Sequence, residues 1–159
     1  MSPRAAWRLE SYGFHQVCDY APGKADWLAF GLPYRGSAQL VGALLTHDVA
    51  TASPRERLGQ VHDRLASSPH GLVVVLNHAR VVAGVLRSDE WEADPDAAVE
   101  DVMREGPTTV RPSEEIEALL ERMQRADTAS AIVTRSDGTL LGLFERTRAE
   151  QQLQTPTQP

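Results

Sequence analysis

The clearest pattern along the chain is a pair of apolar runs, residues 131–134 and 140–144, separated by a polar stretch that contains Asp137-Gly138. The Asp-Gly dipeptide accepts positive φ at both corners of a type I′ turn, whose twist matches that of two antiparallel strands. The pattern therefore predicts a tight β-hairpin.

The segment before this hairpin predicts an amphipathic helix that opens near Pro112. Its apolar residues recur at i, i+3, i+4 and i+7, which is the spacing of one helical face. These residues are Ile116, Leu119, Leu120 and Met123.

The same order of elements occurs earlier in the chain, without any gap. Pro112 follows Pro54 by 58 positions, and Gly142 follows Gly84 by the same number. Apolar positions agree at this offset as well: Leu58 with Ile116, Val61 with Leu119, and Val75 with Val133. One copy is short for an independent core, whereas two copies facing each other can cover each other's apolar sheet faces. We therefore expect a duplicated unit, residues 37–94 and 95–152, that folds as one body.

Within the first copy, the main helix is expected to open at Ser53-Pro54, with Ser53 as its N-cap. The unbroken apolar run at 72–76 predicts a strand buried on both faces. The other expected elements are an extended segment at 49–52, a strand at 81–86 and a closing helix at 87–92; in the second copy they are a helix at 97–103, an extended segment at 106–110 and a closing helix at 145–152. Residues 153–159 have no apolar period and are expected to form a disordered tail.

Residues 1–36 predict a helix at 3–12, a strand at 16–20 and a helix at 25–30. So short an αβα arm cannot bury enough surface to fold alone, and we expect it to pack on the repeat. Its motifs Arg-Ala-Ala-x-x-Leu, Gly-Phe-x-x-Val and Gly-x-x-x-Trp-Leu-x-x-Gly-Leu-Pro resemble the carboxyl-terminal end of a rhodanese domain. In that family the nucleophilic cysteine lies in a loop before the first helix, and the fragment here lacks that loop. Cys18 matches a strand position and is expected to be packed and inert.

Composition and charge mainly exclude classes of function and partner. The 159 residues are 42% hydrophobic and 24% charged, as in an ordinary globular protein. A formal net charge of -6 argues against a nucleic-acid or membrane-surface partner, because such partners need clustered Lys and Arg. A single cysteine and the absence of a run of roughly 20 apolar residues predict a cytoplasmic protein. Lys24 is the only lysine, which indicates the coding bias of a GC-rich bacterial genome.

The order of motifs in each copy resembles that of a cystathionine β-synthase (CBS) domain: helix, Val-Met, Thr-x-Val-x-Pro, amphipathic helix, Ile-Val strand, Asp-Gly turn, Leu-x-Gly strand, helix. The resemblance covers about residues 37–152 and is closer in the second copy. It implies an α/β (α+β) fold of two tandem β-α-β-β-α repeats related by pseudo-two-fold symmetry, with two clefts between them. It also implies a regulatory module, usually a homodimer, that binds AMP, ATP or S-adenosylmethionine.

The resemblance further implies which residues line the clefts. In the family, backbone groups bind the adenine edge, a carboxylate accepts the ribose hydroxyls, and a hydroxyl with a helix amino end holds phosphate. The first cleft is then expected to use Ala50, Thr51, Gly71, Leu72 and Val73. The second is expected to use Thr108, Thr109, Thr128, Ala129 and Ser130.

The third cleft motif of the family, Gly-x-x-Ser/Thr-x-x-Asp, is altered in both copies. Its last two positions hold Arg87 and Glu90 in the first copy, and Glu145 and Arg148 in the second. Glu90 can accept ribose hydroxyls while Arg87 meets phosphate, but Arg148 cannot accept any hydrogen bond. Arg148 reads equally well as a solvated arginine or a member of an ion pair. The first cleft is therefore the better candidate for a nucleotide.

The histidines show no metal-ligand spacing; they are His15, His47, His62, His70 and His78. His62 lies four positions after Leu58 on an apolar helix face, so we expect a hydrogen-bonded histidine in the core or an interface. No nucleophile with a matching base and no glycine-rich phosphate loop is found. The sequence therefore predicts neither catalytic residues nor a metal site.

Three functions follow as hypotheses. The leading one is a non-enzymatic sensor, a homodimer that binds an adenosyl ligand (AMP, ATP or S-adenosylmethionine) as a regulator and requires no cofactor. The second is a structural dimerisation or interaction module with vestigial clefts. The third is a truncated sulfurtransferase that lacks its nucleophile loop.

Overall fold

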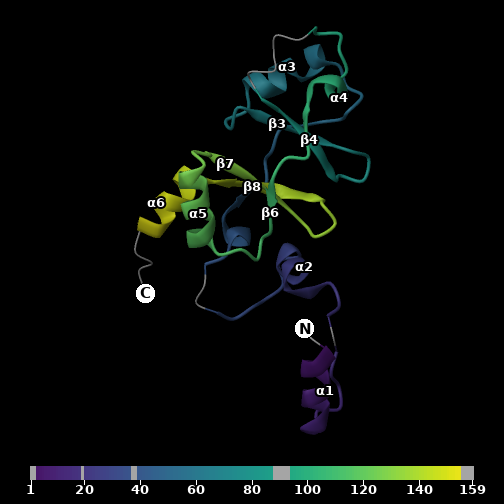
Figure 1. Cartoon of the computed structure of the whole chain (residues 1–159), viewed down its shortest axis with the longest axis vertical. Coiled ribbons are helices and arrows are strands. Elements are labelled where there is room, and N and C mark those ends of the chain that lie inside the picture. The colour runs from purple at the N-terminus through teal and green to yellow at the C-terminus, as the bar shows by residue number, and fades with distance from the viewer. Residues whose placement is uncertain (1–2, 19, 37–38, 88–93, 155–159) are drawn as a thin grey trace.

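A computed structural model describes residues 3–18, 20–36, 39–87 and 94–154, and it contains two four-stranded sheets, one above the other in Figure 1. The upper sheet has the order β2-β3-β4-β5, with β2 (Thr51–Ala52), β3 (Leu72–Leu76), β4 (Val82–Arg87) and β5 (Arg104–Glu105). The lower sheet has the order β1-β8-β7-β6, with β1 (Leu45–Thr46), β8 (Leu140–Glu145), β7 (Ser130–Thr134) and β6 (Thr109–Val110). The expected mixed α/β fold of two repeats is confirmed.

Each sheet is completed by a strand from the other repeat. β1 belongs to the first repeat but pairs antiparallel with β8, so that Thr46 lies opposite Leu143. β5 belongs to the second repeat but pairs antiparallel with β4, so that Arg104 lies opposite Val85. The sequence predicted neither short strand. This reciprocal exchange ties the two repeats together through backbone hydrogen bonds.

The two glycines at equal positions in the repeat lie where the exchanged strand passes closest. A Cβ at Gly142 would lie 2.5 Å from the carbonyl oxygen of Thr46. A Cβ at Gly84 would lie 2.6 Å from Met103 Sδ and 2.9 Å from the carbonyl oxygen of Arg104. Both positions need glycine because a side chain would displace the neighbouring backbone.

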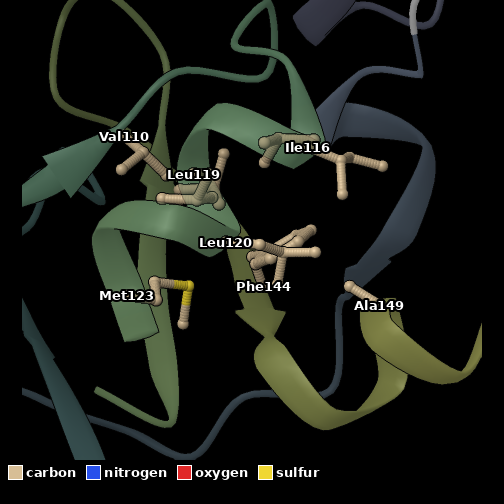
Figure 2. Packing of buried hydrophobic residues seen from close by; sticks show 9 residues of the cluster. Val110, Ile116, Leu119, Leu120, Met123, Phe144 and Ala149 are labelled. Atoms are coloured by element: carbon tan, nitrogen blue, oxygen red, sulfur yellow. The ribbon is translucent and has the colours of Figure 1, made fainter. Parts of the chain in front are cut away.

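The main helix of each repeat packs on one face of its sheet. Around α5 (Ile116–Arg125) the buried residues are Val41 of the 3-10 helix η1 (Val41–Leu44), Val110, Ile116, Leu119, Leu120, Met123, Val133, Phe144 and Ala149 of α6 (Arg146–Gln154), most of them labelled in Figure 2. Around α3 (Leu58–Ala66) they include Val99 of α4 (Val99–Val102). Each core therefore holds a helix of the other repeat, η1 or α4.

The inner faces of the two sheets share one apolar interior. It contains Leu72, Val74, Leu76, Val85, Ile132, Leu140 and Leu143. Along β3 the sides alternate: Val73 and Val75 belong to the core under α3, while Val74 belongs to the shared interior. β3 is buried along its whole length, as its unbroken apolar run predicted. The predicted mutual shielding of the two halves is confirmed.

The β7–β8 turn is not of type I′, and this prediction was wrong. Gly138 has a φ of 86°, but Asp137 does not have positive φ. The Gly138 amide donates to the carbonyl of Arg135 at 3.0 Å, and the Asp137 carboxylate accepts the Thr139 amide at 2.9 Å. The loop is therefore a type I turn followed by a left-handed glycine, and the aspartate side chain stabilises it.

The helix predicted from Ser53 starts later. α3 begins at Leu58, and the Ser53 amide instead donates to Glu56 Oε1 at 3.0 Å in a turn. Arg57, the residue before the helix, forms an antiparallel bridge with Ala98 of the other repeat. The inter-repeat pairing holds the backbone extended there, which delays the helix.

The amino-terminal arm forms its two helices but not its strand. They are α1 (Pro3–Ser11) and α2 (Gly23–Ala29). Residues 16–18 and 20 form no strand, and Cys18 is exposed instead of packed. The guanidinium carbon of Arg135 lies 4.1 Å from the centroid of the Phe30 ring, which holds α2 against the second hairpin. α1 stands away from both sheets (Figure 1).

Three further predictions concern the two closing helices and His62. Arg87 is the last residue of β4, so no helix begins there, and residues 88–92 of the predicted closing helix lie outside the described ranges. The second closing helix is confirmed as α6. His62 is exposed beside Asp63, with 3.3 Å between its Nδ1 and the carboxylate, and not in the core. No helix within the described ranges has the length and apolar character that a membrane crossing requires.

Candidate functional site

A cavity of about 530 Å³ opens at the seam between the repeats. Strand residues of the first repeat form part of its wall: Leu72, Val85 and Arg87. The rest comes from the second repeat, from β5, the segment that leads to β6, α5 and β7. Small-molecule sites have volumes of roughly 300–1,000 Å³, so the cavity is large enough for a ligand of nucleotide size.

Three kinds of side chain line this cavity. The apolar ones include Leu72, Val85 and Ile132, and the hydroxyl-bearing ones are Thr108, Thr128 and Ser130. The charged ones are Arg87, Arg104, Arg122 and Glu105. Arg122 pairs with Glu114 at 2.7 Å, which offsets part of its charge. Among the described lining residues, guanidinium groups outnumber carboxylates, a composition that favours an anionic ligand, and the apolar wall suits a flat ring.

The residues predicted for the second cleft divide between the cavity and its surroundings. Thr108, Thr128 and Ser130 line it, whereas Thr109 and Ala129 are not part of its wall. Thr109 lies in β6 opposite Ile132, and Ala129 accepts the Arg146 amide at 3.0 Å through its carbonyl. Three of the five predicted residues are therefore brought together.

The residues predicted for the first cleft are not brought together in one cavity. Leu72 and Arg87 were expected in the first cleft, but they line the cavity described above, together with residues predicted for the second cleft. Val73 is fully buried in the core, and the carbonyl of Ala50 accepts the Val74 amide at 2.9 Å. Gly71 is exposed, with a φ of 59°, and Glu90 lies outside the described residues. Arg87 was expected in the first cleft because the motif residues of each repeat were assigned together to one cleft.

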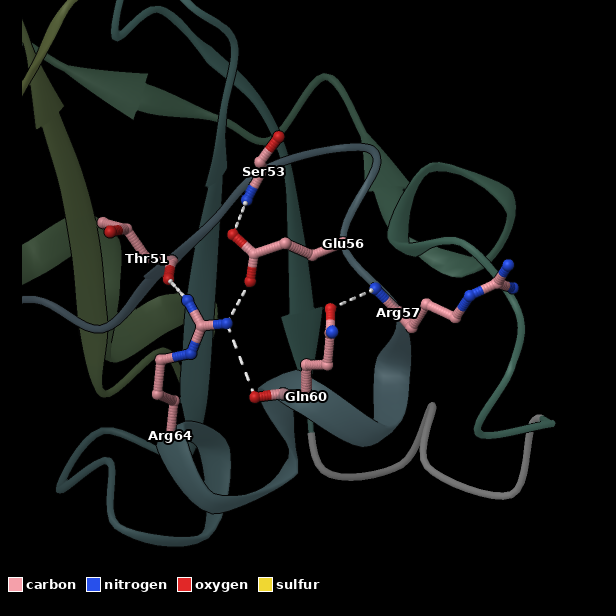
Figure 3. Close-up of polar contacts among 6 residues, drawn as sticks. All are labelled: Thr51, Ser53, Glu56, Arg57, Gln60 and Arg64. Atoms are coloured by element: carbon pink, nitrogen blue, oxygen red, sulfur yellow. Dashed lines mark hydrogen bonds and ion pairs between the residues drawn. The ribbon is translucent and has the colours of Figure 1, made fainter.

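A polar cluster fixes the predicted cleft residue Thr51 (Figure 3). Glu56 pairs with Arg64, and the Arg64 guanidinium donates to the carbonyl oxygen of Thr51 at 2.6 Å. Burial raises the pKa of Glu56, but the Arg64 guanidinium and the Ser53 amide lower it by more, so this pKa lies below its ordinary value of 4.5. The carbonyl of Thr51 is thus already engaged within the protein.

Glu145 and Arg148 lie on the first-cleft side of the seam, beside Thr46 and His70. Thr46 Oγ1 donates to the Glu145 carboxylate and accepts from Arg148 Nη1 at 3.1 Å. His70 Nδ1 lies 3.9 Å from Glu145 Oε2, and the His70 side chain is 8% exposed. Arg148 is exposed near the start of α6, as expected of a solvated arginine near a helix start, and its guanidinium also takes part in this network.

Several residues of both sites escaped the sequence analysis. Arg104, Glu105 and Arg122 were not singled out, because they flank the cavity only after β5 has crossed to the other repeat. His70 was examined only as a metal ligand, and no group of three metal-binding residues occurs in the described part of the chain. At the 58-residue offset His70 is equivalent to Thr128, a residue predicted to line the second cleft. This equivalence could have identified His70 from the sequence.

Comparisons with known proteins agree with this geometry. Residues 99–149 match the family described as CBS domain. The CBS domains of a transcriptional regulator from Streptococcus pneumoniae align with a TM-score of 0.65 at 23% identity, over 71% of this chain and 98% of that one. CBSX2 in complex with AMP aligns with a TM-score of 0.64 at 17% identity, over 72% and 95%.

The cytosolic domain of the Mg²⁺ channel MgtE in complex with ATP gives a TM-score of 0.64 at 19% identity, over 70% of this chain. The present chain covers 48% of that domain, about half its length. No curated protein matches the chain. Residues 99–149 thus match the CBS domain family, and the two repeats together have the fold of a CBS domain pair.

Proposed function

We propose that the chain is a regulatory module that binds an adenosyl ligand in the seam cavity, with ATP or AMP favoured over S-adenosylmethionine. The observation that carries this proposal is the cavity itself, which combines an apolar wall with hydroxyl groups and an excess of arginine. Arginine holds phosphate through paired, charge-assisted hydrogen bonds, whereas the sulfonium cation of S-adenosylmethionine gains nothing from it.

Each part of the ligand has a candidate partner. The base lies against Leu72, Val85 and Ile132, and the phosphates lie near Arg87 and Arg104. For the ribose hydroxyls the cavity wall offers the Glu105 carboxylate. Glu90, which the resemblance assigns to the ribose in the first cleft, lies outside the described residues and stays a prediction.

The proposal agrees with the fold relatives. A CBS-fold protein was solved with AMP and another with ATP, and CBS domains are generally regulatory rather than catalytic. Both repeats line the cavity, so a ligand that contacts Arg87 and Thr128 together bears on how the repeats sit relative to each other. Such a change is what a partner protein, or a second copy in a homodimer, would sense; the homodimer itself stays a prediction.

The sulfurtransferase alternative finds no support in the site. Cys18 lies on the amino-terminal arm and does not line the cavity. The resemblance of residues 1–36 to a rhodanese fragment stays a prediction, and the structural role of that arm is its contact with the repeat through Phe30.

Isothermal titration calorimetry with ATP, AMP and S-adenosylmethionine tests the proposal. We expect ATP to bind most tightly, and Arg87→Ala to weaken ATP binding about tenfold or more, as a lost charge-assisted hydrogen bond of about 1.5–3 kcal/mol implies. Arg55→Ala is the matched control, because Arg55 is exposed and lies outside the cavity wall, and it should bind ATP like the wild type. Absence of binding by all three ligands would favour the structural dimerisation module instead.

A further inference from the structure

The two sides of the seam are equivalent in backbone but differ in side chains. Leu72 opposite Arg87 in the upper sheet matches Ser130 opposite Glu145 in the lower sheet. Several equivalent positions differ between the sides. On the first side His70 stands where the second has Thr128, Glu145 where it has Arg87, and Thr46 where it has Arg104. The backbone therefore offers two comparable clefts, and these side chains decide what each can hold.

From this difference we infer that only the second cleft takes the ligand, because the protein's own side chains fill and seal the first. The inference rests on the proposed function and adds to it a stoichiometry of one ligand per chain. We assign the preference for the second cleft over the first to His70, Glu145 and Thr46.

The His70 side chain already fills part of the first cleft. The His70 side chain is 8% exposed, and its Nε2 atom is buried with no hydrogen-bond partner in the described structure. It thus occupies space on the first side that corresponds to the space beside Thr128, a cavity-lining residue. A ligand would have to displace an imidazole that is already packed.

Hydrogen bonds among Thr46, Glu145 and Arg148 also occupy the polar groups of the first side. Thr46 joins Glu145 and Arg148, so that β1 is linked to the end of β8 and the start of α6 on the first side. The Thr46 hydroxyl uses its proton toward the carboxylate while it accepts from the guanidinium, which leaves it little capacity for a ligand. A ligand that hydrogen-bonds to the Thr46 hydroxyl would have to displace one of these two bonds.

The two clefts also differ in the charge of their side chains. Glu145 places a carboxylate where the second cleft has the Arg87 guanidinium, and a carboxylate repels phosphate at short range. Arg148 offsets this charge only in part, because its guanidinium is directed to Thr46. The first side therefore lacks the anion-binding character of the second.

Calorimetric titration with ATP on three proteins tests the inference. The wild-type chain should bind one ATP per chain. The double variant His70→Thr with Glu145→Arg copies the second-cleft residues into the first and should bind two. Thr128→His copies the obstruction into the second cleft and should weaken ATP binding at least tenfold, and Arg87→Glu provides an independent variant should the histidine disturb folding. Circular dichroism and melting temperature verify the fold of each variant.

Two ATP per wild-type chain would overturn the inference, and so would unchanged binding in folded Thr128→His and Arg87→Glu variants. If the wild-type chain binds no ATP, the proposed function fails while the obstruction stays testable. A site gained by the double variant would then support the obstruction, and continued absence of binding would contradict it.

Discussion

Val81 and Thr139 form an antiparallel bridge with each other at the point where the two hairpins meet. Each residue holds the same place in its own repeat, 58 positions apart, so the bridge lies on the pseudo-two-fold axis. The hydrogen bonds around it are reciprocal: the Val82 amide donates to the carbonyl of Gly138, and the Leu140 amide donates to the carbonyl of Arg80, both at 3.1 Å. The hairpin turns are therefore part of the contact between the repeats.

The two turns predict a stabilising substitution. Arg80 has a φ of 61° at the position where the other repeat has Gly138, and a non-glycine residue there is strained. We expect Arg80→Gly to raise the free energy of unfolding by up to about 1 kcal/mol. The reverse change, Gly138→Ala, should lower it, because the added Cβ would also lie 3.1 Å from Val81 Cγ1. Urea denaturation measures both, and a destabilised Arg80→Gly would contradict the assignment of strain.

Because β1 crosses to the sheet of the other repeat, substitution by alanine should change the stability differently at Gly142 and at Gly59. Gly142→Ala should be strongly destabilising, by about 2 kcal/mol or more, because its Cβ would lie 2.5 Å from the Thr46 backbone. Gly59→Ala is the control: its Cβ would meet ordinary contacts at 3.4 Å, and alanine favours the helix there by up to about 1 kcal/mol. Equal stability of the two variants in thermal denaturation would argue against the exchange of β1.

The shared interior predicts that the two repeats unfold together. Leu143 is fully buried between the sheets, and Leu143→Ala should cost about 2–5 kcal/mol. The loss should appear as one shifted transition, because both sheets contribute to that interior. Two separate transitions in scanning calorimetry of the wild type or the variant would mean that the repeats fold independently.

The lowered pKa of Glu56 predicts a specific sensitivity to acid. A carboxylate whose folded pKa is depressed stabilises the fold above its unfolded pKa, ordinarily 4.5, and that stabilisation disappears as the pH falls through the folded pKa. Glu56→Gln should therefore cost up to about 1 kcal/mol at neutral pH and nothing at low pH. Urea denaturation from about pH 6 to about pH 3 follows this difference, with the exposed Glu121→Gln as control. A pH-independent cost would exclude the ion pair with Arg64 as its source.

The architecture was largely predictable from local patterns. The period of Ile116, Leu119, Leu120 and Met123 predicted α5, and the unbroken run at 72–76 predicted β3, because burial imposes these spacings directly. The offset of Gly84 and Gly142 predicted the duplication. What it did not reveal is why both are glycine, since the reason is a close approach by a strand from the other repeat.

The site was less predictable because it depends on that exchange. Arg87 and Thr128 line one cavity although they come from different repeats, and nothing in the local sequence of either residue indicates this. The helix start at Leu58 was missed for a related reason, since the Arg57 bridge to Ala98 is a tertiary contact. Cys18 was expected to be packed in a strand, but its segment has no partner strand in the described structure.

Backbone amide chemical shifts in nuclear magnetic resonance can map ATP binding to the protein residue by residue. We expect ATP to shift the amide signals of Gly106, Thr128 and Ser130 at the second cleft and to leave those of Gly71 and Thr51 unchanged. Shifts centred on Gly71 and Thr51, or no shift at saturating ATP, would contradict this expectation.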